Sequence, residues 1–208
     1  LKYKLNQDEK GFKFDEFSVL DVGCGPLANI WVAVEEKGYI PASNVFGVDI
    51  DKYALFAGKC VYGEQLAEYG FDWDRQIFCC SAFTMPFESS TFDFIVAISS
   101  LENIVNSTEG VKTEKIDKGL GKGDRDQRDK EFVHKLETLL KPGGSLYLST
   151  FKGEEGHMWS FSESALKSFF EGSSFHIDWV KSYPYPKTDE NMAPTGVTHQ
   201  IISMLPHI

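Results

Sequence analysis

The sequence has few cysteines, no long apolar run and no excess of positive charge. Its four cysteines form no CxxC pair and no spacing typical of a metal site, so we expect buried, reduced thiols. The apolar runs, such as FDFIVAI, are far shorter than the roughly 20 residues that cross a bilayer. No charged start followed by an apolar stretch indicates a signal peptide. We therefore predict a cytoplasmic protein with no membrane partner.

The charge of the chain excludes one large class of partners. The formal net charge is −10, and the acidic residues are spread along the chain without a basic stripe. Binding to DNA or RNA depends on Lys and Arg that neutralise phosphates, so we expect no nucleic-acid partner. A small-molecule substrate fits better. With 208 residues the chain fits a single domain over 1–208, as a monomer or homodimer, with 1–16 as an N-terminal segment.

Strand-like and helix-like segments alternate along the chain, which is typical of a parallel sheet covered by helices on both faces. The last two strands lie near the chain end and are expected to form an antiparallel hairpin at one edge. The predicted fold class is α/β: a single-domain, doubly wound, Rossmann-like sheet of seven strands, mostly parallel, with an antiparallel last strand. The strand candidates are 17–22, 45–50, 75–80, 92–98, 144–150, 175–181 and 197–204. The helix candidates are 27–37, 52–69, 129–140 and roughly 162–171.

One segment does not follow this alternation. Residues 104–130 are strongly charged, contain glycine and have almost no large apolar side chains. Such a stretch buries too little surface to order itself, so we predict a charged, mobile loop. Two roles stay open for this loop: a lid over a functional site, or a solvent-exposed loop without a function of its own.

The stretch VLDVGCGPLANI at 19–30 runs from an apolar strand through a glycine turn into a helix. Gly23 to Ala28 match G-x-G-x-x-A, the fingerprint of dinucleotide binding, and Asp49 lies at the right distance to take a ribose. Asp21 argues against a pyrophosphate on this turn, because the repulsion is on the order of several kcal/mol. A cation is attracted instead. S-adenosylmethionine carries an ammonium and a sulfonium and no phosphate.

Four motifs together resemble those of the class I S-adenosylmethionine-dependent methyltransferases. They are VLDVGCGP at 19–26, VFGVDID at 45–51, SAFTMPFESSTFDFIVAISSLENI at 81–104 and LETLLKPGGSLYLST at 136–150. Their order and spacing match over roughly residues 17–151. The resemblance implies S-adenosylmethionine as cofactor, S-adenosylhomocysteine as product and no metal.

The resemblance also implies which residues surround the methionine end of the cofactor. Asp21 would support the methionine moiety, directly or through water. The backbone of Val22, Gly23 and Gly25 would line the glycine turn. Ser99, which follows the strand 92–98, would face the methionine end and the substrate.

A second set is implied at the adenosine end. Asp49 would take the two ribose hydroxyls, and Ile50 with Asp51 would border the adenine. Ser81 and Ala82 stand where the family often has an acid and a small residue at the adenine edge.

The sequence departs from the family pattern at two positions. Leu27 replaces the third glycine of the usual G-x-G-x-G turn, and Ser81 replaces the usual acid at the adenine. These departures keep open a second hypothesis, a cofactor-binding protein without catalytic activity.

Candidate groups for the methyl-transfer step follow two strands. Glu102 lies after the strand 92–98, and His157 lies between acids and an aromatic-rich stretch, with an unperturbed pKa close to neutrality. We predict transfer of a methyl group to an oxygen or nitrogen of a small molecule, with a sugar or glycan precursor as one option. The alternatives are the cofactor-binding protein without catalytic activity and a NAD-dependent oxidoreductase.

Overall fold

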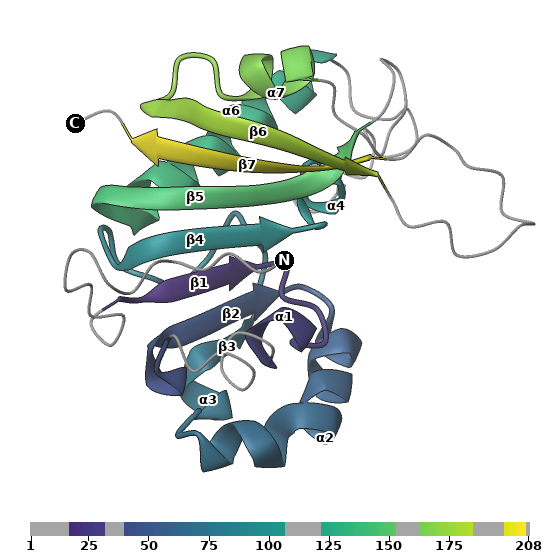
Figure 1. Cartoon of the computed structure of the whole chain (residues 1–208), viewed down its shortest axis with the longest axis vertical. Coiled ribbons are helices and arrows are strands. Elements are labelled where there is room, and N and C mark those ends of the chain that lie inside the picture. The colour runs from purple at the N-terminus through teal and green to yellow at the C-terminus, as the bar shows by residue number, and fades with distance from the viewer. Residues whose placement is uncertain (1–16, 32–39, 107–121, 153–162, 185–197, 207–208) are drawn as a thin grey trace, which may run out of the picture.

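The computed structural model describes residues 17–31, 40–106, 122–152, 163–184 and 198–206. A twisted sheet runs through the centre with the strand order β3-β2-β1-β4-β5-β7-β6 (Figure 1). The strands are β1 (Val19–Val22), β2 (Val45–Asp49), β3 (Ile77–Cys79), β4 (Phe92–Ile98), β5 (Leu140–Lys152), β6 (Phe175–Pro184) and β7 (Thr198–Pro206).

The five strands from β3 to β5 are all parallel to one another. At their centre Asp21 of β1 lies opposite Gly47 of β2 and Val96 of β4. This arrangement confirms the predicted α/β, Rossmann-like fold with a mostly parallel sheet. Beyond β5 the backbone pairing continues with β7 and then β6, each antiparallel to its neighbour.

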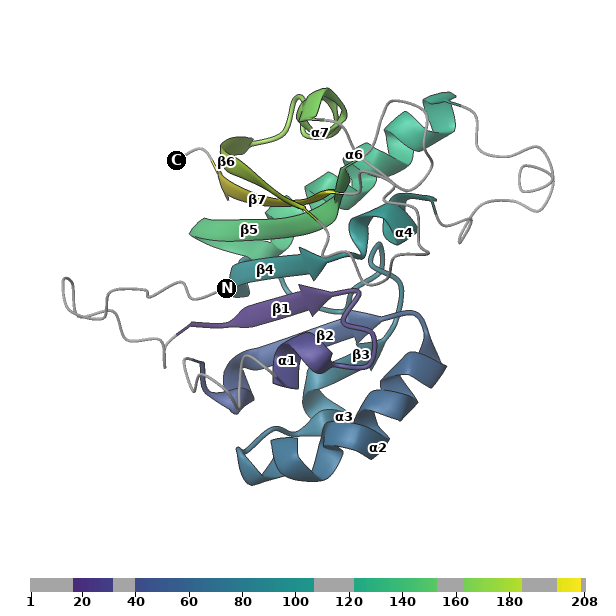
Figure 2. The same cartoon turned by 45° about the vertical axis from the view of Figure 1, so that its right-hand side comes forward.

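Helices cover both faces of the sheet, as α1 and α6 on opposite sides show (Figure 2). One apolar cluster joins Leu20 and Val22 of β1 to Phe132 and Leu136 of α6, and a second, smaller cluster lies under α1 and α2. The helices are α1 (Ala28–Trp31), the 3-10 turn η3 (Ala42–Asn44), α2 (Lys52–Glu68), α3 (Trp73–Gln76), α4 (Leu101–Asn106), α6 (Lys122–Leu139) and α7 (Glu163–Phe169). Among the described residues, no helix is long and apolar enough to cross a membrane.

The predicted loop at 104–130 is wrong at both of its ends. Residues 104–106 belong to α4 and 122–130 to α6, while 107–121 lie outside the described residues. Polar and charged side chains support this part of α6 through contacts that apolar periodicity does not reveal. The Gln127 amide donates to Glu131 at 2.9 Å, and the Arg128 guanidinium lies 4.4 Å from the centre of the Phe83 ring.

Two further expectations need correction. The cysteines are all thiols, but only Cys24 is buried, whereas Cys60 and Cys79 are exposed and Cys80 is half-buried. The predicted strand at 75–80 begins only at Ile77, because its first two residues close the short helix α3.

Gln76 explains why α3 ends where it does. The side chain is buried, and its amide donates to the carbonyl of Ala42 at 2.7 Å and also to that of Val45. Its Oε1 accepts from the Asp72 backbone N–H at 2.7 Å. Two hydrogen bonds of this side chain therefore join α3 to η3 and to the start of β2, and the third closes α3 on its own N-cap residue.

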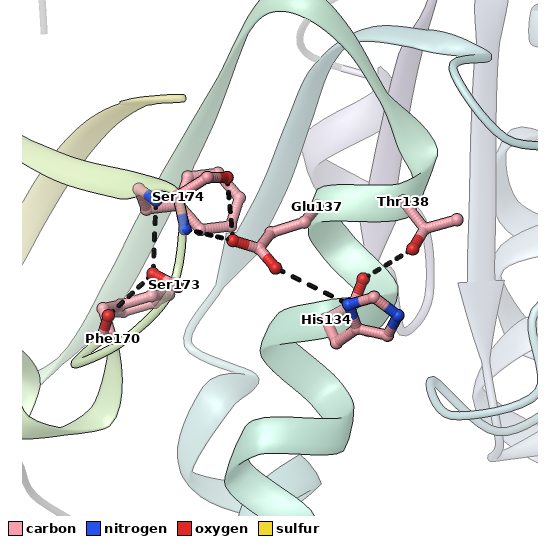
Figure 3. Close-up of polar contacts among 7 residues, drawn as sticks. His134, Glu137, Thr138, Phe170, Ser173 and Ser174 are labelled. Atoms are coloured by element: carbon pink, nitrogen blue, oxygen red, sulfur yellow. Dashed lines mark hydrogen bonds and ion pairs between the residues drawn. The ribbon is translucent and has the colours of Figure 1, made fainter. Parts of the chain in front are cut away.

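A second set of polar contacts, around Glu137, joins α6 to the turn before β6 (Figure 3). Glu137 accepts from the backbone and the hydroxyl of Ser174, and lies 3.7 Å from the exposed His134 ring. Because α6 leads into the first residue of β5, these contacts lie at the amino ends of the parallel strands. They are a structural connection at the end of the sheet opposite to the carboxyl ends of the strands, which are discussed below.

We expect Gln76→Leu to lower the free energy of unfolding by about 3 kcal/mol, because two buried carbonyls and one partly buried N–H lose their partner. Urea unfolding of the purified protein measures this. Gln65→Leu on the exposed side of α2 is the matched control and should change stability by less than about 0.5 kcal/mol. Equal effects of the two substitutions would show that the Gln76 network does not hold α3.

Candidate functional site

A cavity of about 340 Å³ opens at the carboxyl ends of β1 to β4. In doubly wound sheets this edge is where ligands bind. Seven of the residues predicted from the sequence line it: Gly23, Asp49, Ile50, Asp51, Ser81, Ala82 and Ser99. The other lining residues are Val48, Cys80, Phe83, Ser100, Asn103 and Ile104.

Asp49, the last residue of β2, is the best-anchored carboxylate of the cavity. Its Oδ2 accepts from the Gly25 backbone N–H at 2.8 Å, and its Oδ1 accepts from the Asp51 backbone N–H at 2.8 Å. Asp51 in turn caps α2, since its Oδ1 accepts from the Tyr53 and Ala54 backbone N–H groups at 2.9 and 3.2 Å. Each Asp49 oxygen has a second lone pair, so the carboxylate can hold the turn and still accept from a ligand.

The glycine turn is shaped by its closest neighbour across the sheet. Gly23 has φ +74°, and a Cβ there would lie 2.4 Å from the Cβ of Ser100. The Ser100 hydroxyl donates to the Val22 carbonyl at 2.8 Å, which closes the turn from the β4 side. At Gly25, with φ +51°, no atom lies within 4 Å of the Cβ position, so this side of the turn is open to a ligand.

Leu27 stands where the family pattern has a third glycine, and the structure shows what this costs. Its φ of +62° is a conformation that costs a residue with a side chain about 1–2 kcal/mol. Its side chain is completely buried, in the cluster with Cys24, Ile30 and Leu66. Burial of the side chain offsets the backbone strain, so the turn keeps its glycine-like shape without the glycine.

Asp21 lies beneath this turn and not on the cavity wall. The residue is 2% exposed, and neither carboxylate oxygen has a hydrogen-bond partner of good geometry among the described residues, although the Asn29 side chain lies nearby. Burial, and secondly the negative charge of Asp49, raise its pKa from 3.8 to about 7, while the nearby Asn29 side chain lowers it somewhat. A buried carboxylate without a partner favours a cation at this end of the cavity.

Ser99 has φ +50°, and its N–H donates to the Ser149 carbonyl at 2.9 Å. It therefore marks the point where β4 leaves the sheet and α4 begins. Glu102 belongs to α4, although its side chain lies outside the part of the chain that can be described, and His157 lies outside it altogether. The structure thus brings together the predicted cofactor residues around one turn and leaves the two catalytic candidates as predictions.

The sequence reasoning missed Ser100 and Phe83. Ser100 acts through Gly23 and Val22, which are far away in the sequence, so only the three-dimensional contact reveals it. Ser100 directly follows Ser99, which the resemblance assigned, so inspection of one more residue after the strand 92–98 would have found it. Phe83 lies two residues after Ser81, whose hydroxyl accepts from the Phe83 N–H at 3.3 Å. It belongs to the motif at 81–104, but the resemblance assigned it no role.

Solved structures share this fold. The cyclase SpnF is 16% identical, with a TM-score of 0.63 over 93% of this chain and 76% of that protein. A SAM-dependent methyltransferase from Methanosarcina mazei is 16% identical, with a TM-score of 0.60 over 95% of both chains. A SAM-dependent methyltransferase from Aquifex aeolicus is 15% identical, with a TM-score of 0.53 over 92% of this chain and 83% of that one. At these identities the likeness defines the fold.

The fold, the glycine turn and the cavity at the strand ends define a Rossmann-like cofactor-binding protein. A family model described as a methyltransferase domain matches residues 20–123, half of the chain. The chain therefore belongs to the class I S-adenosylmethionine-dependent methyltransferases. No curated protein sequence matches it. S-adenosylmethionine is accordingly the cofactor, in preference to NAD, and the unpartnered Asp21 beside an open turn fits its positive charge.

We expect Leu27→Gly to be at least as stable as Leu27→Ala, by up to about 1 kcal/mol, because glycine relieves the strain that alanine keeps. Both variants should be less stable than the wild type by about 2–5 kcal/mol, since the buried side chain is lost. Chemical denaturation of the variants measures the order. Leu55 in α2 is the control, because there Gly should be about 1 kcal/mol worse than Ala. The same order at both positions would contradict strain at Leu27.

The stability of the protein should depend on the ionisation of Asp21. The pKa of Asp21 is about 7 in the folded protein and near 3.8 in the unfolded chain. Above pH 3.8 the unfolded chain loses this proton while the folded protein keeps it, so the free energy of unfolding falls as the pH rises. The fall is complete once the pH has passed through 7. The loss is of the order of 4 kcal/mol. We expect Asp21→Asn to stabilise the cofactor-free protein at about pH 8 and much less at about pH 5. Thermal unfolding at both pH values measures it, with Asp74→Asn on the surface as control. A stabilisation independent of pH would disprove the linkage.

Proposed function

We propose that this methyltransferase transfers the methyl group of S-adenosylmethionine to an oxygen or nitrogen of a small molecule, a sugar or glycan precursor among the options. The observation that carries the proposal is the cavity at the strand ends, with the anchored Asp49 carboxylate on its wall. Its volume of about 340 Å³ suits a small-molecule ligand.

The adenosine would lie against the residues that follow β2 and β3. In this proposal Asp49 accepts hydrogen bonds from the two ribose hydroxyls, and Ile50 with Asp51 borders the adenine. Ser81 and Ala82 contact the adenine edge. The exposed Ile50 side chain beside the cavity supports this assignment, because an apolar side chain there gives the ring a surface on which to pack.

The methionine end would lie over the glycine turn. Gly25 leaves its side of the turn open, and the backbone of Val22, Gly23 and Gly25 provides the floor. Asp21 supplies negative charge from below, so a cation should favour its ionised form. Ser99 faces the methionine end and the acceptor.

S-adenosylmethionine supplies an electrophilic methyl group on a positively charged sulfur. The task of the chain is then to align the acceptor and to exclude water. The half-buried Phe83 and Ile104 provide apolar surface at the cavity, and Asn103 provides an amide that can orient a polar acceptor. In our proposal Glu102 or His157 removes the proton from the acceptor as general base.

The proposal takes the chain as one methyltransferase-like domain over 1–208, located in the cytoplasm, with neither nucleic acid nor membrane as a partner. It keeps the sheet of seven strands with an antiparallel last strand, which the pairing of β7 with β5 supports. A cofactor-binding protein without transferase activity is the second candidate. Ser81 in place of the adenine acid and the same fold in the cyclase SpnF favour it.

Calorimetric titration with S-adenosylhomocysteine, beside NADH, tests the site. We expect binding of S-adenosylhomocysteine alone, and a loss of about tenfold to a hundredfold in affinity in Asp49→Ala, because hydrogen bonds to a charged group are lost. Asp74→Ala, on the exposed side of α3, is the control and should bind as the wild type does.

Unchanged affinity in Asp49→Ala would remove Asp49 from the ribose site. Radiolabelled methyl transfer to a panel of small hydroxyl and amine compounds then separates the two functions. Binding with turnover supports the transferase, whereas binding without turnover across the panel supports the second candidate.

A further inference from the structure

Ser100 lies where the glycine turn meets the part of the cavity wall that belongs to α4. It stands between β4 and α4, and α4 lies beyond the carboxyl end of β4 (Figure 2). Two residues of this helix, Asn103 and Ile104, line the cavity, and we call them the α4 wall. A Cβ at Gly23 would lie 2.4 Å from the Ser100 Cβ and 2.9 Å from its hydroxyl oxygen. One buried residue therefore contacts the glycine turn and directly precedes the helix that carries the α4 wall.

The glycine turn is held by hydrogen bonds on both of its sides. On the β2 side the Gly23 N–H donates to the Val48 carbonyl at 2.8 Å. This is a backbone bond that any residue except proline can form. On the β4 side the Ser100 hydroxyl donates to the Val22 carbonyl at 2.8 Å, and both residues are buried. The hold on the β4 side therefore depends on a single side chain.

The backbone of Ser100 also starts α4. The Asn103 and Ile104 N–H groups both donate to the Ser100 carbonyl at 3.0 Å, so the first turn of the helix depends on where Ser100 lies. A helix of 6 residues is too short to be stable by itself. Its stability depends on contacts at its start, which are these hydrogen bonds and the complete burial of Leu101. A displacement of Ser100 would therefore move the α4 wall.

The residue before Ser100 has a strained backbone. The φ of Ser99 is +50°, a left-handed conformation that is unfavourable for a residue with a side chain. Its N–H donates to the Ser149 carbonyl at 2.9 Å, which fixes the end of β4 at the point where the chain turns into α4. Strain of this kind persists where the surrounding structure enforces it, and it is frequent in active sites and switch regions. The contacts of Ser100 with the glycine turn lie directly beside this strained position.

We propose that Ser100 is a positioning residue that couples the glycine turn to the α4 wall, so that cofactor binding fixes this wall before the acceptor enters. The inference rests on the proposed placement of the methionine end over the glycine turn. A cofactor seated there holds Gly23 against Ser100, and the Ser100 carbonyl passes this constraint on to the N–H groups of the α4 wall. The role is one of positioning, because the Ser100 hydroxyl donates its proton to the Val22 carbonyl. The cofactor then binds first and the acceptor second.

Amide hydrogen exchange of the full chain, read by NMR with and without saturating S-adenosylhomocysteine, tests the coupling. In the wild type we expect S-adenosylhomocysteine to slow the exchange of the Asn103 and Ile104 N–H groups by about fivefold or more. In Ser100→Ala this protection should be lost even at saturation. Calorimetry should show an affinity about fivefold to tenfold weaker in Ser100→Ala, because the turn has lost a buried hydrogen bond. Direct shielding of these N–H groups by the ligand would instead persist in the variant.

Ser173→Ala is the matched control. The Ser173 hydroxyl donates to the Phe170 carbonyl at 2.7 Å, so this variant loses the same kind of hydrogen bond in the turn before β6, at the other end of the sheet. It should bind S-adenosylhomocysteine and protect the α4 wall as the wild type does, and circular dichroism with urea unfolding shows that both variants are folded.

Two results overturn the coupling and leave the cofactor site in place. One is protection of the α4 wall that persists in Ser100→Ala. The other is a wild type that binds S-adenosylhomocysteine without protection of the α4 wall, and this measurement does not depend on the folding of any variant. A wild type that does not bind S-adenosylhomocysteine overturns the proposed function, and the coupling with it.

Discussion

The hydrogen bonds of the Asp49 carboxylate are the constraint on which the site depends. Its two oxygens hold the N–H groups of Gly25 and Asp51 at 2.8 Å, so one side chain joins the end of β2, the glycine turn after β1 and the start of α2. These segments meet only because β1 and β2 are parallel neighbours. The carboxylate that organises the turn also lines the cavity, so its loss would disturb both.

Asp21 differs from Asp49, because its carboxylate is buried without comparable hydrogen bonds. It lies a few residues from the same turn, buried and without a hydrogen-bond partner of good geometry among the described residues, with its pKa raised to about 7. Such a group destabilises the folded protein at neutral pH. In the binding mode proposed above, the positive charge of the cofactor would offset this cost. Asp49 stabilises the turn before binding, whereas Asp21 would become favourable only with the cofactor bound in that mode.

The sequence was informative wherever local chemistry decides structure. The glycine turn and the strand at 92–98 follow from propensity and short-range hydrogen bonds, and they are found where expected. The sequence was misleading wherever a contact between residues distant in the chain decides the local structure. Gln76 ends a helix inside a predicted strand because it bonds to carbonyls before and in β2, and the charged start of α6 is helical beside Phe83.

The cavity itself has two chemically different ends, and this difference bears on the reaction. Near β2 its wall carries the carboxylates Asp49 and Asp51, while near β4 it carries the hydroxyls of Ser99 and Ser100 and the Asn103 amide. The acidic end suits the hydroxyl groups of a ribose, and the end near β4 suits a polar, uncharged acceptor. Since related folds serve a cyclase as well as methyltransferases, the fold does not select the reaction. In the proposed binding mode the groups around β4 and α4 would do so, because they are the ones that an acceptor beside the methyl group would touch.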